Sequence, residues 1–454
     1  MHDPEADFHA FDAAHERDTP HFFAANAPVF VARAPGRLDV MGGIADYSGS
    51  LVAEMPIAAA AVCACQRDDA HGGAVTVRSL NAASEGLQAE VTMPAPVFTN
   101  PVSLLRWLLE RPRDERWAGY LGGCVSLLRA EGLIPKGAGA RFLLRSEVPL
   151  GAGVSSSAAV EVAAMRSVCA AFGIVISPLE LARLCQRVEN DVMDAPCGVM
   201  DQVTSVMGEA GKLLLLLCQP HTVQGTVALP DDWTVFGIDS GVKHSVAGVG
   251  YTNVRVAAFM GYKILSERAK SGFNGYLCNV TPERYVQLTD TDPLPETLSG
   301  ADFLREHNGI FDTVTVVDPA QTYPVRAATA HPVFENVRVA AFVEALRDGS
   351  DSAFVEAGRL MLSAHRSYSD CGIGTPETDL LVELAAAQGE SVAGAKITGG
   401  GSGGTVCVLL KQSDETRVLE NIRDEYTTRT GIVPRVIQGT SPGAWETPVR
   451  KRNG

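Results

Sequence analysis

The glycine- and serine-rich segment at residues 149–159 constrains the fold of this chain more than any other stretch. It reads Pro-Leu-Gly-Ala-Gly-Val-Ser-Ser-Ser-Ala-Ala, after an apolar strand pattern at 141–145 and at the start of a helical pattern over 155–172. The serines fall on the first helical turn, where free N–H groups and the positive end of the helix dipole attract anions. The glycines let the backbone approach a ligand closely. The segment predicts a site for nucleotide phosphates, with hydroxyls that can also bind Mg²⁺; an ordinary capped helix is the alternative.

A second glycine-rich segment, residues 396–405, contains a G-x-G-x-x-G match at Gly399, Gly401 and Gly404. This match alone is weak evidence for a dinucleotide-binding fold, because a strand pattern follows the glycines as much as it precedes them. The first segment is not a Walker A loop either, since no Gly-Lys-Ser/Thr follows it. A loop that closes over a ligand is the better interpretation of residues 396–405.

The length and the patterns of the chain predict two domains of mixed α/β and α+β class. The chain has 454 residues, against about 150 for a typical domain. Strands are expected at 28–34 (ending in a turn at Pro35-Gly36), 51–65, 141–145, 212–219, 233–240 and 404–410, and helices at 100–131, 155–172, 178–190, 250–269, 332–347, 351–367 and 376–388. The expected division is an extension (1–26), an N-terminal domain (27–228), a C-terminal domain (229–446) and a tail (447–454). Residues 270–325 show little periodicity, which suggests an insertion or lid.

Charge and cysteine usage exclude several classes of function. The formal net charge is −15, which opposes binding to a nucleic-acid backbone. No apolar run approaches the roughly 18–20 residues of a membrane span, and the acidic N-terminus does not resemble a secretory signal. The ten cysteines are scattered without a C-x-x-C pair, as expected of a reduced, cytoplasmic protein without structural zinc. The sequence sets no oligomeric state, and a monomer is compatible with it.

Two further segments place charged residues beside glycines. Arg37 and Asp46 lie in the segment Arg-Ala-Pro-Gly-Arg-Leu-Asp-Val-Met-Gly-Gly-Ile-Ala-Asp-Tyr at 33–47, and Asp201 follows Gly198 in Pro-Cys-Gly-Val-Met-Asp-Gln at 196–202. Taken singly, each of these side chains is more simply interpreted as a solvated surface charge.

In combination, the segments at 33–37, 149–158 and 394–404 resemble, in that order, the three motifs of the GHMP kinases of sugars and metabolites. Matches at Trp117-x-x-Tyr120, residues 196–202, Lys243-His-Ser with Tyr251, and Ala364-His-Arg-Ser are similar to the galactokinase branch. Within that branch, the first motif resembles that of the kinase portion of L-arabinokinases, which also reads Gly-Arg-Leu-Asp-Val-Met-Gly-Gly-Ile-Ala-Asp-Tyr. The resemblance covers nearly all of the chain beyond residue 27.

The resemblance implies a two-lobed GHMP kinase fold, with a ribosomal S5-like N-terminal lobe and a ferredoxin-like C-terminal lobe, and ATP and Mg²⁺ as cofactors. Asp201 would lie beside the anomeric hydroxyl as base or charge stabiliser, and Arg37 would keep it ionised and offset the charge of the transferring phosphoryl group. Ser157 and Glu189 match positions that hold magnesium. Trp117 would stack on adenine, unless it is a core residue. The phosphates would lie in the turn formed by Gly151, Ala152, Gly153, Val154, Ser155, Ser156 and Ser157.

By the same resemblance, Asp46, Gly198 and Tyr251 match sugar-contacting positions. Galactokinases carry Gly-Glu-His-Thr-Asp-Tyr in the first motif, where the glutamate and histidine meet the 6-hydroxyl of galactose; this chain has Gly43 and Ile44 there. β-L-Arabinopyranose superposes on α-D-galactopyranose without its CH₂OH arm, so it needs no polar partner at this place. A galactose 6-hydroxyl buried unpaired beside Ile44 would cost about 1–3 kcal/mol. The alternative is that these substitutions merely repack a loop.

Three functions remain open from the sequence. The first is an ATP-dependent sugar 1-kinase that converts L-arabinose to β-L-arabinose 1-phosphate. The second is a galactokinase with a modified 6-position pocket. The third is a catalytically silent homologue that senses sugar, which the retention of Arg37, Ser157, Glu189 and Asp201 disfavours.

Overall fold

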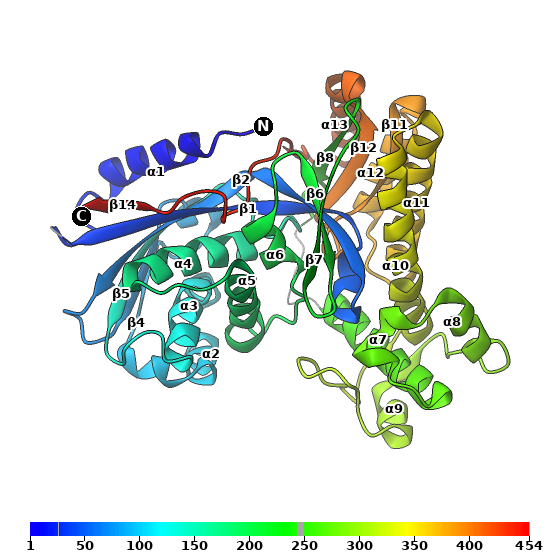
Figure 1. Ribbon diagram of the computed structural model, residues 1–454, viewed down its shortest axis with the longest axis horizontal. Helices are drawn as coiled ribbons and strands as arrows, with labels where there is room; N and C mark the ends of the chain where they lie inside the picture. The colour runs from blue at the N-terminus through cyan, green and yellow to red at the C-terminus, as the bar shows by residue number, and fades with distance from the viewer. Residues whose placement is uncertain (26, 243–248, 454) are drawn as a thin grey trace.

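The computed structural model describes residues 1–25, 27–242 and 249–453, which build two sheets side by side with helices packed on each (Figure 1). The larger sheet has the order β14-β1-β2-β5-β3-β4, and β6 and β7 extend it from β2. Its pairs are antiparallel except for β3 and β5, which run parallel. The strands are β1 (Pro28–Met41), β2 (Leu51–Asp68), β3 (Val75–Ser79), β4 (Glu90–Met93), β5 (Gly139–Ser146), β6 (Lys212–Leu217), β7 (Thr222–Ala228) and β14 (Arg450–Asn453).

Helices cover both faces of this sheet. One face carries α2 (Pro101–Leu109), α3 (Ala118–Ala130), α4 (Ser156–Phe172), α5 (Pro178–Arg187) and α6 (Met200–Met207), with α4 packed directly on β1 and β2. The other face carries α1 (Pro4–Asp18), which Figure 1 shows across the sheet from α4. Phe8 and Phe11 of α1 are buried against Val31 of β1. The N-terminal segment is therefore packed onto the sheet rather than loosely attached.

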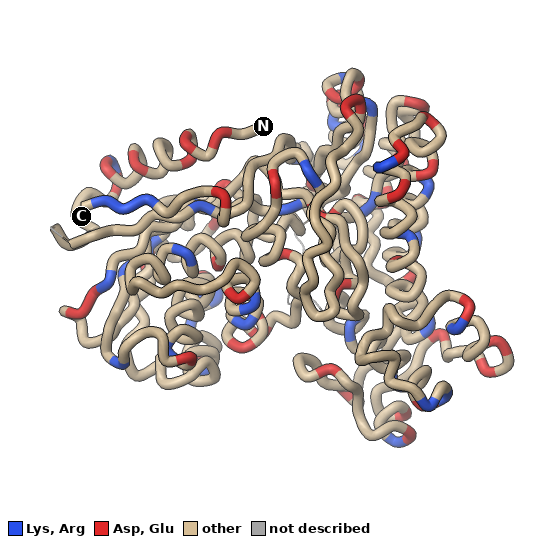
Figure 2. Tube along the Cα trace, in the orientation of Figure 1, with Lys and Arg blue, Asp and Glu red and all other residues tan. Residues whose placement is uncertain are grey.

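The C-terminal strand β14 adds a charged contact to the same face. Its basic residues lie beside the acidic helix α1, whereas elsewhere lysine and arginine alternate with acidic residues along the chain (Figure 2). Arg450 pairs with Glu5 and Arg452 pairs with Asp12. The two ends of the chain thus stabilise one another on β1.

The smaller sheet is antiparallel, in the order β11-β12-β8-β13. Its strands are β8 (Trp233–Asp239), β11 (Val392–Ile397), β12 (Thr405–Lys411) and β13 (Arg435–Ile437), and its helices are α10 (Val325–Asp348), α11 (Asp351–Asp370), α12 (Pro376–Ala386) and α13 (Glu415–Thr430). This layer of helices on an antiparallel sheet confirms the predicted α+β lobe. After β8, α7 (Val249–Ala269) packs on α10 and leads into α8 (Pro282–Thr289), α9 (Gly300–Glu306) and the short pair β9 (Leu298–Ser299) and β10 (Thr322–Tyr323) (Figure 1).

Most of the predicted elements are confirmed, with differences in detail at Pro35-Gly36, at the start of α10 and within residues 270–325. The turn at Pro35-Gly36 is a bulge inside a continuous β1, where the register against β2 shifts. Helix α10 begins at Val325 and contains Pro332 in its interior, because burial of the preceding turns outweighs the proline. The region 270–325 holds short helices that begin at side-chain caps, with Thr281 at α8 and Ser299 at α9.

Hydrogen bonds between the lobes bring the three sequence motifs together. The backbone N–H of Asp39 in β1 donates to Thr398 Oγ1 at 2.7 Å. Thr405 Oγ1 in turn donates to the carbonyl of Ala152 at 2.8 Å. The domain boundaries proposed from the sequence stay a prediction. Of the helices described, none combines the length and the apolar character that a membrane span requires.

Candidate active site

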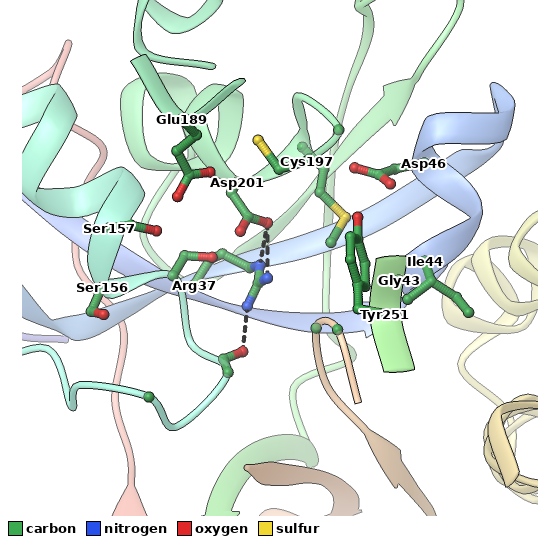
Figure 3. A pocket seen from close by; sticks show the side chains of 17 residues that line it. Arg37, Gly43, Ile44, Asp46, Ser156, Ser157, Glu189, Cys197, Asp201 and Tyr251 are labelled. Atoms are coloured by element: carbon green, nitrogen blue, oxygen red, sulfur yellow. Dashed lines mark hydrogen bonds and ion pairs between the residues drawn. The ribbon is translucent and has the colours of Figure 1, made fainter. Parts of the chain in front are cut away.

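A pocket of about 680 Å³ lies where the three motifs meet. Figure 3 shows Arg37 and Asp201 at its centre, with Ser156, Ser157 and Glu189 on one side and Asp46, Tyr251 and Gly43 on the other. The residues that line it are Arg37, Gly43, Ile44, Asp46, Gly151, Gly153, Ser155, Ser156, Ser157, Glu189, Cys197, Gly198, Met200, Asp201, Tyr251, Gly399 and Gly400. The pocket therefore joins residues from β1, the start of α4 and the glycine loop between β11 and β12.

The side chain of Arg37 connects both sides of this pocket. Its Nε and Nη2 lie 2.9 and 2.8 Å from Asp201 Oδ1, and its Nη1 donates to the carbonyl of Gly153 at 2.8 Å. The Arg37 side chain is 3 % exposed, whereas that of Asp201 is 21 % exposed and can be reached from the pocket. Burial by itself would lower the pKa of Arg37, but Asp201 and neighbouring carboxylates raise it above its ordinary value. The arginine is thus a fixed positive charge at the centre of the site.

A second carboxylate behind Arg37 was not among the residues predicted from the sequence. Glu54 of β2 has a side chain with 0 % exposure, and its Oε2 lies 3.2 Å from Arg37 Nε. Burial and the nearby Asp39 raise the pKa of Glu54 well above its usual range, against the opposing effect of Arg37. The only sequence signal was a single acidic residue within an apolar strand, because such a residue requires a buried partner.

The turn before α4 has the backbone geometry of a ligand cradle. Gly151, Gly153 and Ser155 have φ angles of 74°, 74° and 60°, in the left-handed region. Ser155 precedes the helix without a side-chain cap, and its Oγ is buried without a hydrogen-bond partner among the described residues. Ser156 and Ser157 begin the helix, and both line the pocket. The helix start therefore faces the pocket with free N–H groups, which favours an anion.

Glu189 lies beside this helix start and fits a divalent cation. It is 2 % exposed, and its Oε2 accepts a hydrogen bond from Gln202 Nε2 at 3.1 Å. Burial raises the pKa of Glu189. Mg²⁺ prefers such oxygen ligands and completes its shell with water and phosphate oxygens. No three His, Cys, Asp or Glu side chains form a metal cluster within the described ranges, so the pair of Glu189 and Ser157 would depend on oxygens of a bound phosphate.

A second, more apolar pocket of about 650 Å³ shares Ser156 and Ser157 with the first. Trp117 lines it, and the Trp117 indole N–H donates to the carbonyl of Gln88 at 2.9 Å, which fixes the ring. Tyr120, Leu144 and Val160 add aromatic and apolar surface. An apolar cavity next to an anion site has the chemistry required for a nucleotide base.

On the opposite side of the main pocket, Asp46 is enclosed by backbone and aromatic rings. A Cβ atom at Gly198 would lie 1.7 Å from Asp46 Oδ2, so only glycine fits at position 198. The ring of Tyr251 packs edge-on against Tyr47, with 6.0 Å between the ring centres. Burial, followed by the charge of Asp201, raises the pKa of Asp46 to about 7. Asp46 is therefore a buried acceptor that titrates near neutral pH.

The predicted insertion contributes a residue to this side. Asp312 holds Arg255 of α7 by two hydrogen bonds of 2.8 and 2.9 Å. The guanidinium of Arg255 stacks at 5.2 Å from the ring centre of Tyr47, and its charge opposes the rise in the pKa of Asp46. These two residues were not predicted, since 57 positions separate them in the sequence.

Nearly all residues predicted from the sequence meet in this region. Ala152 and Val154 are the exceptions within the turn, because their side chains are buried in the core rather than in the pocket. Trp117 lies in the adjacent apolar pocket. Ile44 lines the main pocket but is only 2 % exposed and packs into the hydrophobic cluster of the second lobe. The predicted match at Lys243-His-Ser lies outside the described residues.

Comparisons with known proteins identify the family to which this chain is similar. The family "GHMP kinases N terminal domain" matches residues 119–209, "GHMP kinases C terminal" matches 342–428, and "Galactokinase galactose-binding signature" matches 20–67. The L-arabinokinase of Arabidopsis thaliana is 39% identical over 98% of this chain, which spans about half (49%) of that protein's length. The galactokinase of Homo sapiens is 30% identical over 88% of each chain. That of Mycobacterium bovis is 31% identical over 91% of this chain and 98% of its own.

Solved structures show the same fold. The galactokinase of Lactococcus lactis complexed with galactose superposes with a TM-score of 0.76 at 20% identity, covering 96% of this chain and 99% of that one. A mevalonate kinase superposes with a TM-score of 0.53 at 14% identity, over 89% and 97% of the two chains. The predicted two-lobed fold is confirmed. The chain belongs to the GHMP kinase family, in the branch that holds the galactokinases and L-arabinokinase.

Proposed function

We propose that this protein is a sugar 1-kinase that uses ATP and Mg²⁺ to convert L-arabinose to β-L-arabinose 1-phosphate. One observation carries the proposal: Arg37 binds Asp201 and the carbonyl of Gly153 at the same time. The Arg37 side chain thereby sets the distance between Asp201 on the sugar side of the pocket and Gly153 on its phosphate side. Such alignment is the main requirement of phosphoryl transfer.

In this proposal Asp201 lies against the anomeric hydroxyl and accepts or holds its proton. Arg37 orients Asp201 and offsets the negative charge that develops between donor and acceptor. Glu54, behind Arg37, fixes the guanidinium from the side away from the pocket. The catalytic centre is therefore a charged triad in which only Asp201 is partly exposed.

The turn of Gly151, Gly153 and Ser155 would hold the phosphates of ATP, and the apolar pocket at Trp117 would hold its base. Ser157 and Glu189 would hold Mg²⁺, which neutralises phosphate charge when bound. The site residues and the cytoplasmic location stay predictions.

We expect kcat/KM to be highest for L-arabinose. The sugar side offers Asp46 and Tyr251 as polar partners, while Gly43 has no side chain and Ile44 has an apolar one. D-Galactose would bury its 6-hydroxyl unpaired, which predicts a kcat/KM about 5- to 150-fold lower. A coupled assay of ADP release with L-arabinose, D-galactose and D-fucose measures this, and D-fucose should fall between the other two because it lacks the hydroxyl.

A galactokinase is the second candidate, because residues 20–67 match the galactose-binding signature. Higher turnover of D-galactose than of L-arabinose would establish it. Binding of either sugar without release of ADP would instead indicate a sensor.

The affinity for the sugar should depend on pH through Asp46, whose pKa is raised to about 7. The ionised carboxylate is the stronger acceptor for sugar hydroxyls, so kcat/KM for the sugar should fall about tenfold per pH unit below that value. Asp46→Asn should have low activity and a flat profile between about pH 6 and 8. A profile unchanged by this substitution would contradict the role of Asp46.

The carboxyl of Asp46 should stabilise the folded protein at low pH, where it lowers kcat/KM. Its folded-state pKa lies above the unfolded value, so the native protein retains the proton to higher pH than the unfolded chain does. The stabilisation is present in full below the unfolded pKa and is lost as the pH rises through about 7.

A further inference from the structure

A buried tyrosine lies directly behind the wall of the main pocket that Gly43 and Ile44 form. Tyr368 of α11 is 0 % exposed. Its hydroxyl accepts the backbone N–H of Ile44 at 2.9 Å and donates to the carbonyl of Gly399 at 3.0 Å. Ile44 and Gly399 both line the main pocket, and they come from different lobes. One hydroxyl group therefore ties the two parts of this wall together.

The same hydroxyl occupies the room that a side chain at position 43 would need. Gly43 has a φ of +45°, and a Cβ atom built on it would lie 1.5 Å from Tyr368 Oη and 2.8 Å from both Tyr368 Cζ and Asp39 Oδ2. All three distances are far shorter than a van der Waals contact, and the collision with the tyrosine hydroxyl is the most severe. With Tyr368 in place, only glycine is compatible with position 43.

Other buried groups pack around the ring of Tyr368. The ring of His331 packs edge-on against it at 5.2 Å between centres, and Lys396 Nζ lies 5.4 Å from the ring centre. Lys396 forms a fully buried ion pair with Asp39 at 2.8 Å. Asp39 also accepts the backbone N–H groups of Gly43 at 3.0 Å and Gly399 at 3.1 Å. Tyr368, the Lys396–Asp39 ion pair and the two glycines therefore form one continuous network of buried contacts.

We propose that Tyr368 is a positioning residue that, together with Gly43, determines sugar specificity. It keeps position 43 without a side chain and fixes the backbone of Ile44, so that no polar group at position 43 can reach a hydroxymethyl arm on the sugar. This inference rests on the proposed function, because it explains how the pocket favours a pentopyranose. Gly43 and Tyr368 are accordingly a coupled pair, and neither alone sets the preference.

The test is a double-mutant cycle that measures kcat/KM for L-arabinose and D-galactose. Gly43→Glu alone should lower both values by about 100-fold or more, because its Cβ collides with the tyrosine. Tyr368→Leu removes the hydroxyl and the ring. The combination Gly43→Glu/Tyr368→Leu should recover at least about tenfold on D-galactose relative to Gly43→Glu, and should raise the galactose-to-arabinose ratio about tenfold over the wild type.

Two single variants separate this role from a structural one. Tyr368→Phe should raise the KM for the sugar several-fold while kcat and the KM for ATP stay within about twofold, because only the bridge between Ile44 and Gly399 is lost. Tyr323→Phe is the matched control: this tyrosine is also buried and hydrogen-bonded, to Asp318, but lines no part of the pocket. Tyr323→Phe should leave the KM and the sugar ratio unchanged.

Additive effects of Gly43→Glu and Tyr368→Leu, with an unchanged sugar ratio, would overturn the inference. If the double variant does not fold, Tyr368→Phe decides, since an unchanged KM for the sugar overturns it equally. Failure of the wild type to phosphorylate L-arabinose would contradict the proposed function instead, and the coupling would then still be measured on D-galactose.

Discussion

Replacing Asp201 by asparagine is expected to lower kcat by about 10²- to 10⁴-fold, with the affinity for ATP within a few-fold of the wild type. The amide retains the size of the carboxylate but can neither take the proton of the sugar hydroxyl nor balance the charge of Arg37. Asp201 lies 2.8 Å from Arg37 and does not line the apolar pocket proposed for the base. Single-turnover kinetics and titration with a non-hydrolysable ATP analogue measure the two effects separately.

Asp194→Asn is the matched control for this variant. Asp194 is exposed, lies seven positions before Asp201 and lines neither pocket, so its replacement should leave kcat unchanged. Loss of ATP binding in Asp201→Asn would indicate a structural role and would contradict the assignment of Asp201 to the chemical step.

Replacing Arg37 by methionine is expected to abolish turnover and to lower the free energy of unfolding by about 3–5 kcal/mol. The loss leaves Glu54 buried without its ion-pair partner, 3.2 Å from where the guanidinium was. Because burial already raises the pKa of Glu54 well above its usual range, this carboxyl would take up a proton, which limits the cost. Chemical denaturation monitored by tryptophan fluorescence measures the change.

The double variant Arg37→Met/Glu54→Gln separates stability from catalysis. Removing both charges should recover more than half of the lost stability, because no uncompensated charge stays buried, while turnover should stay abolished. Recovered turnover would show that Arg37 serves only to neutralise Glu54. A double variant as unstable as Arg37→Met would show that Glu54 is not the source of the cost.

The sequence allowed the prediction of residues that lie in continuous motifs. Arg37, Asp201 and the turn before α4 were identified because glycines flank them and because the motifs occur in a known order. The bulge at Pro35-Gly36 was predicted as a turn, since proline and glycine occur in turns and in β-bulges alike. Only the pairing of β1 with β2 distinguishes a bulge from a turn here, because the register shift between Pro35 and Arg37 lets the strand continue.

Residues that act through distant partners could not be predicted. Lys396 and Asp39 are 357 positions apart, and Lys396 is the lone charge of β11 whereas Asp39 shares β1 with Arg33 and Arg37. Tyr368 follows the matched segment at 364–367, yet nothing in its neighbourhood indicates that its hydroxyl reaches Gly43. Such contacts depend on how the two lobes pack, which local patterns do not encode.

We expect the phosphoryl group to be transferred to the anomeric oxygen of a pentose held against Asp201. The most direct measurement is ¹³C NMR of the product formed from ATP and [1-¹³C]-L-arabinose. The C1 resonance of the product should be split by coupling to ³¹P and should have the chemical shift of the β-pyranose anomer. An unsplit C1 resonance in a product that nevertheless contains phosphate would contradict it.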